Sequence, residues 1–229
     1  MLLRCGNKLL RCGSKLLRLE PAEITPVKYG LLYNWYAATD ARNIAPAGWN
    51  IPSYSEWNLL SLIGIGSGGK LKETGTTYWD SPNTGATNEV GFNARGTGVR
   101  GLTGGFFYLN AYGYWWQIPV NVSGSNYLIL EYNSASTLVW IGDGGTNYKK
   151  IGRAIRYIKD DSNDPETVTG NDGKIYPTVK IGDQVWTACN VAETKYRNGD
   201  AIPEVTDNAA WAALTTGALC AYDNDWNNV

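Results

Sequence analysis

The chain has 229 residues, 43% of them hydrophobic, and a formal net charge of −1, which suits one large domain or two small ones. The near-neutral charge excludes nucleic acid as an expected partner, and no apolar run approaches the roughly 18 residues of a membrane helix. Ten tryptophans and 15 tyrosines against 3 phenylalanines favour binding surfaces as well as cores, because these rings carry a polar group. The 27 glycines indicate a turn-rich α+β or irregular β fold rather than a helical bundle.

Residues 1–19 repeat with a period of seven, as LLRCGNK, LLRCGSK and LLRL. Glycine costs about 1 kcal/mol in a helix, whereas Gly-Asn and Gly-Ser favour two-residue turns, so we expect short strands rather than a coiled coil. A disordered basic tail is the alternative. We expect the segment to attach the protein and to drive oligomerisation, with a trimer favoured. The attachment residues are the paired leucines Leu2, Leu3, Leu9, Leu10, Leu16 and Leu17.

The same segment bears on charge and on location. Residues 1–18 hold five basic and no acidic side chains, which suits an acidic partner. The first 20 residues lack the continuous apolar stretch of a secretory signal, so we expect the protein to stay in the cytosol or to be released by another route.

Residues 20–28 contain two prolines and are predicted to be a linker, followed by a single domain over residues 29–229. The first predicted helix lies in PSYSEWNLLSLI, where Ser53 and Glu56 have the spacing of a capping box. Its inward side is formed by Trp57, Leu60 and Ile63.

The second predicted helix lies in TDNAAWAALTT, with Asp207 as its cap and Gly217 as its stop. Trp211 and Leu214 are expected to face inward. Most of the remaining sequence predicts short strands and turns, with strands expected at Tyr127–Tyr132, Thr137–Ile141, Arg153–Ile158 and within Asn171–Ala188.

Catalysis is not expected. The chain has no histidine, which is the commonest general base and the usual partner of a cysteine nucleophile. Its four cysteines form no C-x-x-C pair, so we expect no zinc site and interpret Cys189 and Cys220 as buried thiols. No cofactor is expected; calcium at Asp223–Asp225 or Asn171–Gly173 is the alternative, because both offer carboxylate and amide oxygens.

Residues 112–150 form the region that we expect to bind a ligand. Alternation in YLILEY places Leu128 and Leu130 on one face and Tyr127, Ile129 and Glu131 on the other. Rigid aromatic anchors mixed with adaptable polar groups are typical of a paratope, and a merely solvated sheet face is the alternative. The expected ligand-binding residues are Tyr112, Gln117, Asn121, Tyr127, Glu131, Asn133, Trp140, Asp143, Asn147 and Tyr148. The residues expected in the core are Trp35, Trp49, Trp57, Trp79 and Trp115.

Several long motifs are spread over residues 29–229. They include YGLLYNWYAA (29–38), APAGWNIPSYSEWNLL (45–60), GYWW (113–116), IRYIKD (155–160) and DGKIYPTVKIGDQVW (172–186). Together they resemble the Fibrobacter succinogenes major paralogous domain. This resemblance implies a C-type-lectin-like fold of short antiparallel strands, long loops and two short helices. The family occurs in bacterial surface proteins and in proteins of Bacteroides phages, including variable proteins of diversity-generating retroelements.

The order of these motifs departs from the family pattern. The segment that resembles residues 168–229 normally precedes the segment that resembles residues 29–160. The resemblance therefore implies a circular permutation, in which 168–229 completes the same domain in this chain or in a neighbouring subunit. We expect Asp225–Val229 to lie near Val27–Leu31. We also expect Arg153–Ile158 to become a neighbour of Tyr176–Ile181.

The resemblance implies a non-enzymatic virion display protein of a phage, in a head fibre or at the tail, assembled in the host cytoplasm. Residues 1–19 are then expected to bind a capsid or tail protein, and the body to bind a host-surface glycan or protein, with several copies adding avidity. No nucleic acid or membrane partner is expected. The alternatives are a bacterial cell-surface adhesin module, a structural virion decoration protein without a ligand, and an enzyme related to the formylglycine-generating fold.

Overall fold

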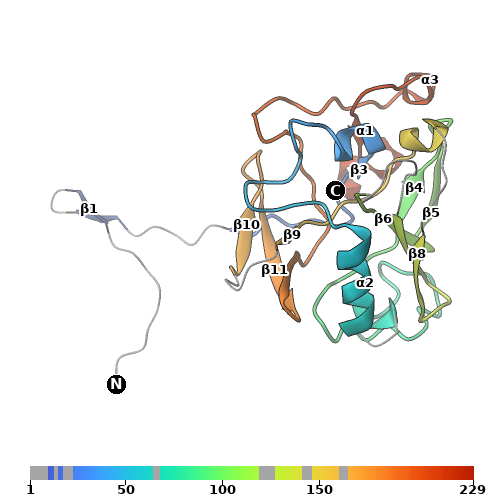
Figure 1. Ribbon diagram of the computed structural model, residues 1–229, viewed down its shortest axis with the longest axis horizontal. Helices are drawn as coiled ribbons and strands as arrows, with labels where there is room; N and C mark the ends of the chain where they lie inside the picture. The colour runs from blue at the N-terminus through green and yellow to red at the C-terminus, as the bar shows by residue number, and fades with distance from the viewer. Residues whose placement is uncertain are drawn as a thin grey trace.

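The structure is a computed structural model that describes residues 10–12, 15–17, 23–63, 68–118, 127–140, 146–159 and 165–229. Side chains are described at these positions except in 10–17, 61–63, 137–140 and 146–147. The described residues between 29 and 229 form a mixed α+β body of short strands, long connections and few short helices (Figure 1). None of the helices in the described ranges has the length and apolar character needed to cross a membrane.

Two short strands of the N-terminal segment pair with each other. Strand β1 (Leu10–Cys12) pairs antiparallel with β2 (Lys15–Leu17), and Cys12 lies opposite Lys15. The predicted short strands are therefore confirmed for residues 10–12 and 15–17, while the two residues between them lie outside the described residues. The remainder of residues 1–22 and the side chains of the six predicted attachment leucines lie outside the described residues.

A five-stranded sheet carries the predicted binding region and lies along one side of the body (Figure 1). Its order is β5-β4-β6-β7-β8; β4 and β6 are parallel, and the other neighbours are antiparallel. The strands are β4 (Thr97–Arg100), β5 (Phe106–Leu109), β6 (Tyr112–Trp116), β7 (Tyr127–Glu131) and β8 (Thr137–Trp140). The predicted alternation in β7 is confirmed, because Leu128 and Leu130 are buried while Tyr127, Ile129 and Glu131 are half-buried on the other face.

A four-stranded antiparallel sheet joins segments that are far apart in the sequence. Its order is β10-β11-β12-β9, built from β9 (Ile158–Lys159), β10 (Thr167–Thr169), β11 (Ile175–Ile181) and β12 (Gln184–Thr187). The strands predicted within 171–188 are therefore confirmed. The predicted neighbourhood of 153–158 and 176–181 is wrong, because β9 pairs with β12, which lies between β9 and β11. Residues 153–154 make isolated bridges instead of a continuous strand.

Contacts across the expected permutation junction lie within one chain. Strand β3 (Leu32–Tyr33) pairs with β13 (Leu219–Cys220). The backbone N–H groups of Lys28 and Tyr29 donate to main-chain oxygens of Val229 and Asn228, both over 3.1 Å. The predicted proximity of residues 225–229 to residues 27–31 is confirmed, and it needs no neighbouring subunit.

The longest helix, α2 (Tyr54–Ile63), begins as predicted. The hydroxyl oxygen of Ser53 accepts from the backbone N–H of Glu56 at 3.3 Å, and the Glu56 carboxylate accepts from the N–H of Ser53. This is the reciprocal capping box, which satisfies two donors at the helix start. Trp57 and Leu60 are buried, as expected.

Helix α3 (Asn208–Ala212) also has its predicted cap, since Asp207 Oδ1 accepts from the N–H of Ala210 at 2.7 Å. The predicted stop is wrong, because the helix ends at Ala212, well before Gly217. A Cβ at Gly217 would lie 2.2 Å from the Tyr196 hydroxyl, so this glycine is required for packing. The remaining helices are α1 (Trp35–Ala38) and the 3₁₀ turns η1 (Gly68–Leu71), η2 (Thr146–Lys150), η3 (Tyr222–Asn224) and η4 (Trp226–Asn228).

The core is built largely from aromatic rings. Trp57 lies 4.8 Å from Trp186 between ring centroids, under the inner face of the five-stranded sheet. Such tilted and edge contacts stabilise beyond the area that they bury. The five tryptophans predicted for the core are all buried: Trp35, Trp49, Trp57, Trp79 and Trp115.

Candidate functional site

The outward side of the five-stranded sheet carries a continuous row of aromatic side chains. We call Phe107, Tyr108, Tyr112, Tyr114 and Tyr127 the aromatic row. Successive ring centroids lie 6.0, 5.2, 5.8 and 6.1 Å apart in that order, which is contact distance for aromatic pairs. Phe107 and Tyr108 are 47% and 54% exposed. The row thus offers flat rings to solvent on a regular support.

The support beneath the row is rigid. A Cβ at Gly113 would lie 2.2 Å from the Trp115 ring, so glycine here lets the indole pack directly under β6. The buried ammonium of Lys72 donates to the backbone oxygens of Glu131 and Ser134 at 2.9 and 3.0 Å and fixes the end of β7. Packed side chains and charge-assisted hydrogen bonds of this kind hold a surface in one geometry.

Tyr108 adopts an unusual backbone conformation. Its φ is +67°, in the left-handed region that bulky side chains rarely occupy and that costs on the order of 1–3 kcal/mol. The ring that this conformation displays is the most exposed of the row. Strain kept at an exposed aromatic residue is typical of a surface under functional constraint.

The row ends beside a buried arginine. The guanidinium carbon of Arg153 lies 3.8 Å from the Tyr127 ring centroid and 4.2 Å from that of Trp116. Burial lowers the pKa of Arg153 to about 9. Burial likewise raises the pKa of Tyr114, and it raises that of Tyr112 with a smaller contribution from Glu131. All three groups are therefore driven towards their neutral forms.

Three of the ten predicted ligand-binding residues lie on this face. They are Tyr112 and Tyr127, both in the row, and Glu131, which lies opposite Tyr112 in the register of β6 and β7. Two more, Asn133 and Tyr148, are exposed. The backbone of Trp140 and Asn147 lies in β8 and η2, but their side chains are not among those described. Asn121 and Asp143 lie outside the described residues.

The prediction for Gln117 is wrong, because its side chain is fully buried. The chain leaves β6 inward rather than along the face. The next residue, Ile118, makes a parallel bridge to Ser53 and donates from its N–H to the oxygen of Pro52 at 2.9 Å. This contact joins the chain after β6 to the residues that precede α2.

Sequence reasoning missed four members of the site: Phe107, Tyr108, Tyr114 and Arg153. The alternation of GYWW contained a signal for Tyr114, which shares a face with Tyr112. Phe107 and Tyr108 belong to a strand that was not predicted, and their position beside β6 depends on the long-range order β5-β4-β6. No sequence pattern places Arg153 next to Tyr127.

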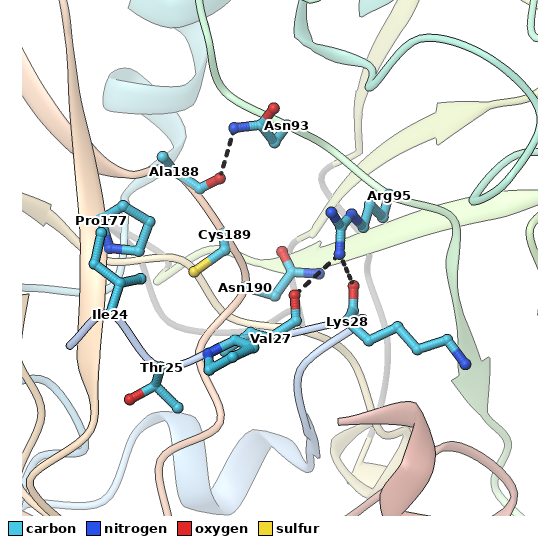
Figure 2. A pocket seen from close by; sticks show the side chains of 11 residues that line it. Ile24, Thr25, Val27, Lys28, Asn93, Arg95, Pro177, Ala188, Cys189 and Asn190 are labelled. Carbon is cyan, nitrogen blue, oxygen red and sulfur yellow. Dashed lines mark hydrogen bonds between the residues drawn. The ribbon is translucent and has the colours of Figure 1, made fainter.

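A separate cavity of about 260 Å³ lies where the linker crosses the body (Figure 2). Arg95 lines it and donates to the backbone oxygens of Val27 and Lys28 at 2.9 and 2.6 Å. The Cys189 side chain also lines the cavity, and burial raises the pKa of its thiol to about 11. A protonated thiol is a poor nucleophile, so the arrangement locks the linker in place rather than preparing a reactive cysteine.

A buried carboxyl pair lies elsewhere, beside the start of β11. The Glu193 carboxylate accepts from the backbone N–H groups of Asn171 and Asp172, both at 2.8 Å. Burial, and then the charge of Asp172, raise the pKa of Glu193 to about 8. The Asp172 carboxylate accepts from the N–H and hydroxyl of Thr194, and these contacts join the turn before β11 to residues 193–194.

The described residues contain no cluster of three or more His, Cys, Asp or Glu side chains that could hold a metal ion. At each of the two segments considered as a calcium site, one carboxylate already accepts hydrogen bonds from protein donors. Asp172 Oδ2 accepts from Lys174 and Thr194, and Asp225 Oδ1 accepts from the N–H of Asn227 at 2.9 Å.

Residues 19–159 match the sequence profile of the Fibrobacter succinogenes major domain. The chain belongs to this family. The match covers more than half of the chain and includes the aromatic row and the whole five-stranded sheet. Curated proteins and solved structures yield no match.

Within this Fibrobacter succinogenes major domain protein, residues 165–229 lie beyond the matched region yet pack into the same body. The circular permutation stays a prediction from motif order. The pairings β9 with β12 and β3 with β13 supply the contacts that it requires.

Proposed function

We propose that this protein is a non-enzymatic receptor-binding protein of a phage virion, located in a head fibre or at the tail. Its body is then a C-type-lectin-like display domain that binds a host-surface glycan or protein through the aromatic row. The observation that carries the proposal is the row itself: five aromatic side chains in mutual contact, half-buried or exposed, on one face of a sheet fixed from behind. Tyrosine surfaces of this type bind with little loss of conformational entropy.

The N-terminal repeats supply the other half of the proposal. The paired strands β1 and β2 come from a basic segment with leucine pairs, and an isolated pair of strands is marginal in water. We assign to residues 1–19 the docking on a capsid or tail protein and the association of copies, with a trimer favoured. Several bodies on one particle then add their weak contacts into avidity.

Substitution of the row tests the binding claim. A virion carrying Tyr108→Ala, Tyr112→Ala and Tyr127→Ala is expected to adsorb to host cells at least about tenfold less, because hot-spot aromatics carry most of the energy of an interface. Tyr54→Ala is the matched control, since Tyr54 is an exposed tyrosine on α2. Unchanged adsorption by intact particles that carry the triple variant would contradict receptor binding and favour a decoration protein without a ligand.

A further inference from the structure

Three arginines are buried in the described part of the chain, and two of them are fully satisfied. Arg156 donates from its three guanidinium nitrogens to Asn190 Oδ1 and to the backbone oxygens of Phe92, Thr187 and Asn93 over 2.6–3.0 Å. Arg100 donates to Gly104, Val205 and Thr206 oxygens in the same manner. Each of these guanidinium groups cross-links backbone segments, which explains its burial.

Arg153 differs from both. Its side chain is 3% exposed, yet its Nε and Nη1 are buried without a hydrogen-bond partner. Its side chain donates to none of the residues that the structure describes, and no carboxylate among them forms an ion pair with it. A buried guanidinium without acceptors loses its hydration and gains nothing comparable in return.

Two aromatic rings compensate for part of this cost. Trp116 and Tyr127 lie on the guanidinium at 4.2 and 3.8 Å, and desolvated cation–π contacts contribute on the order of 2 kcal/mol. Rings accept through their faces, whereas guanidinium N–H groups point outward in the guanidinium plane. The buried Nε and Nη1 of Arg153 thus keep in-plane donors without an acceptor, which a bound anion would satisfy.

The backbone position of Arg153 places its side chain on the side of the sheet that carries the aromatic row. Ala154 belongs to the inner cluster with Trp115 and Leu128, and Arg153 precedes it on a bridged segment. Alternation therefore places the Arg153 side chain on the outer face of the sheet. Its contact with Tyr127, the half-buried last ring of the row, agrees with this placement.

We infer that the aromatic row binds an acidic sugar, whose carboxylate pairs with the Arg153 guanidinium while its ring lies on Tyr127 and Tyr114. This inference rests on the proposed binding function and names the ligand class. A carboxylate matches the planar fork of arginine and accepts two parallel N–H bonds. Because Nε and Nη1 are buried and the Tyr127 ring lies on the guanidinium, binding in this way requires the Tyr127 side chain to move.

Matched oligosaccharides test the ligand class on the full chain. The probes are 3′-sialyllactose and an oligogalacturonate, each against its methyl ester, measured by titration calorimetry and by competition with adsorption. At least one acid is expected to bind about tenfold or more tightly than its ester, because a charge-assisted pair is worth about 1.5–3 kcal/mol. Equal binding of acid and ester would overturn the inference, as would loss of adsorption after protease treatment, but not glycosidase treatment, of the host cells.

Substitution of Arg153 supplies a readout that does not depend on the ligand. Arg153→Met removes an unsatisfied charge, so the unfolding midpoint is expected to stay the same or rise, while the preference for acid over ester disappears. Arg156→Met removes four hydrogen bonds and is expected to lower the midpoint. Arg153→Lys keeps the positive charge but loses the planar pair of N–H donors, and is expected to retain part of the preference for acid over ester.

The outcomes separate the two proposals. Destabilisation by Arg153→Met equal to that by Arg156→Met would make Arg153 structural and overturn the inference. Failure of the row substitutions to reduce adsorption would instead overturn the proposed function.

Discussion

The backbone N–H of Lys28 donates to the main-chain oxygen of Val229 over 3.1 Å. The Lys28 ammonium also reaches the Asn228 side-chain oxygen at 3.2 Å. These contacts join the beginning of the body to its last residues within one chain. The junction between residues 159 and 165, in contrast, connects β9 to β10, the two edge strands of one sheet. The segments 29–159 and 165–229 therefore meet at two junctions, one between residues 29 and 229 and one between residues 159 and 165. A covalent connection is needed at only one of these junctions.

A relinked chain is expected to fold. In this variant residues 165–229 come first, a short Gly/Ser linker joins residue 229 to residue 29, and the chain ends at residue 159. Both sheets and both junction pairings are retained, so the loss of stability is expected to be limited to about 1–3 kcal/mol from linker entropy and from the missing clamp of Arg95 on the linker. Urea denaturation followed by circular dichroism measures the change.

The matched control opens the fold inside a buried element. A permutant with its termini between Trp115 and Trp116, in the middle of β6, is expected not to fold. An unfolded relinked chain under native conditions would contradict the structural equivalence of the two junctions and weaken the permutation prediction.

Local signals in this sequence were sufficient where a single interaction decides the structure. The Ser53–Glu56 capping box, the Asp207 cap and the alternation of Leu128 and Leu130 follow from chain neighbours alone. Long-range features could not be obtained in this way. Gln117 is buried because the chain after β6 bridges to the residues before α2, and Arg153 meets Tyr127 only after β7 pairs with β6. The choice of β12 rather than β11 as the partner of β9 likewise depends on the three-dimensional order of the sheet.

The stability of the protein is expected to fall as the pH rises from about 5 to 8. The pKa of Glu193 is about 8 in the fold against an ordinary value of 4.5, so the folded state binds the additional proton in this window. Stability is then full below the lower value and is lost as the pH passes through the higher one, by up to about 1.4 kcal/mol per pH unit. Because the chain has no histidine, no imidazole titration competes in this range.

Glu193→Gln is expected to flatten this dependence, measured as the urea midpoint at pH 5, 6, 7 and 8. Glu166→Gln, at an exposed carboxyl, is the control and is expected to retain the slope. A wild-type midpoint that rises between pH 5 and 8 would mean that the buried carboxyl is ionised in the fold.

The two body cysteines are expected to resist thiol reagents. Burial raises the pKa of Cys220 to about 12 and that of Cys189 from 9.0 to about 11. At neutral pH the thiolate fraction of Cys189 is thereby reduced about 100-fold, and the thiolate is the reactive form. In a Cys5→Ser/Cys12→Ser chain, reaction with a disulfide reagent should be slow in buffer and fast in urea. Fast labelling in buffer would show that Cys189, which is half-buried, is accessible despite the linker beside it.

Replacement of Tyr108 is expected to separate binding from stability. Asparagine tolerates the left-handed backbone that tyrosine occupies at φ +67°, so Tyr108→Asn relieves strain while it removes the most exposed ring of the row. The free energy of unfolding is expected to stay equal or to rise by about 1 kcal/mol, and adsorption of the virion to fall. Tyr112→Asn is the control at a regular β position, where the same change loses ring contacts without relief of strain and is expected to destabilise. If Tyr108→Asn lowers stability as much as Tyr112→Asn, the Tyr108 ring supports the fold, and its backbone strain is then balanced by packing rather than retained for binding.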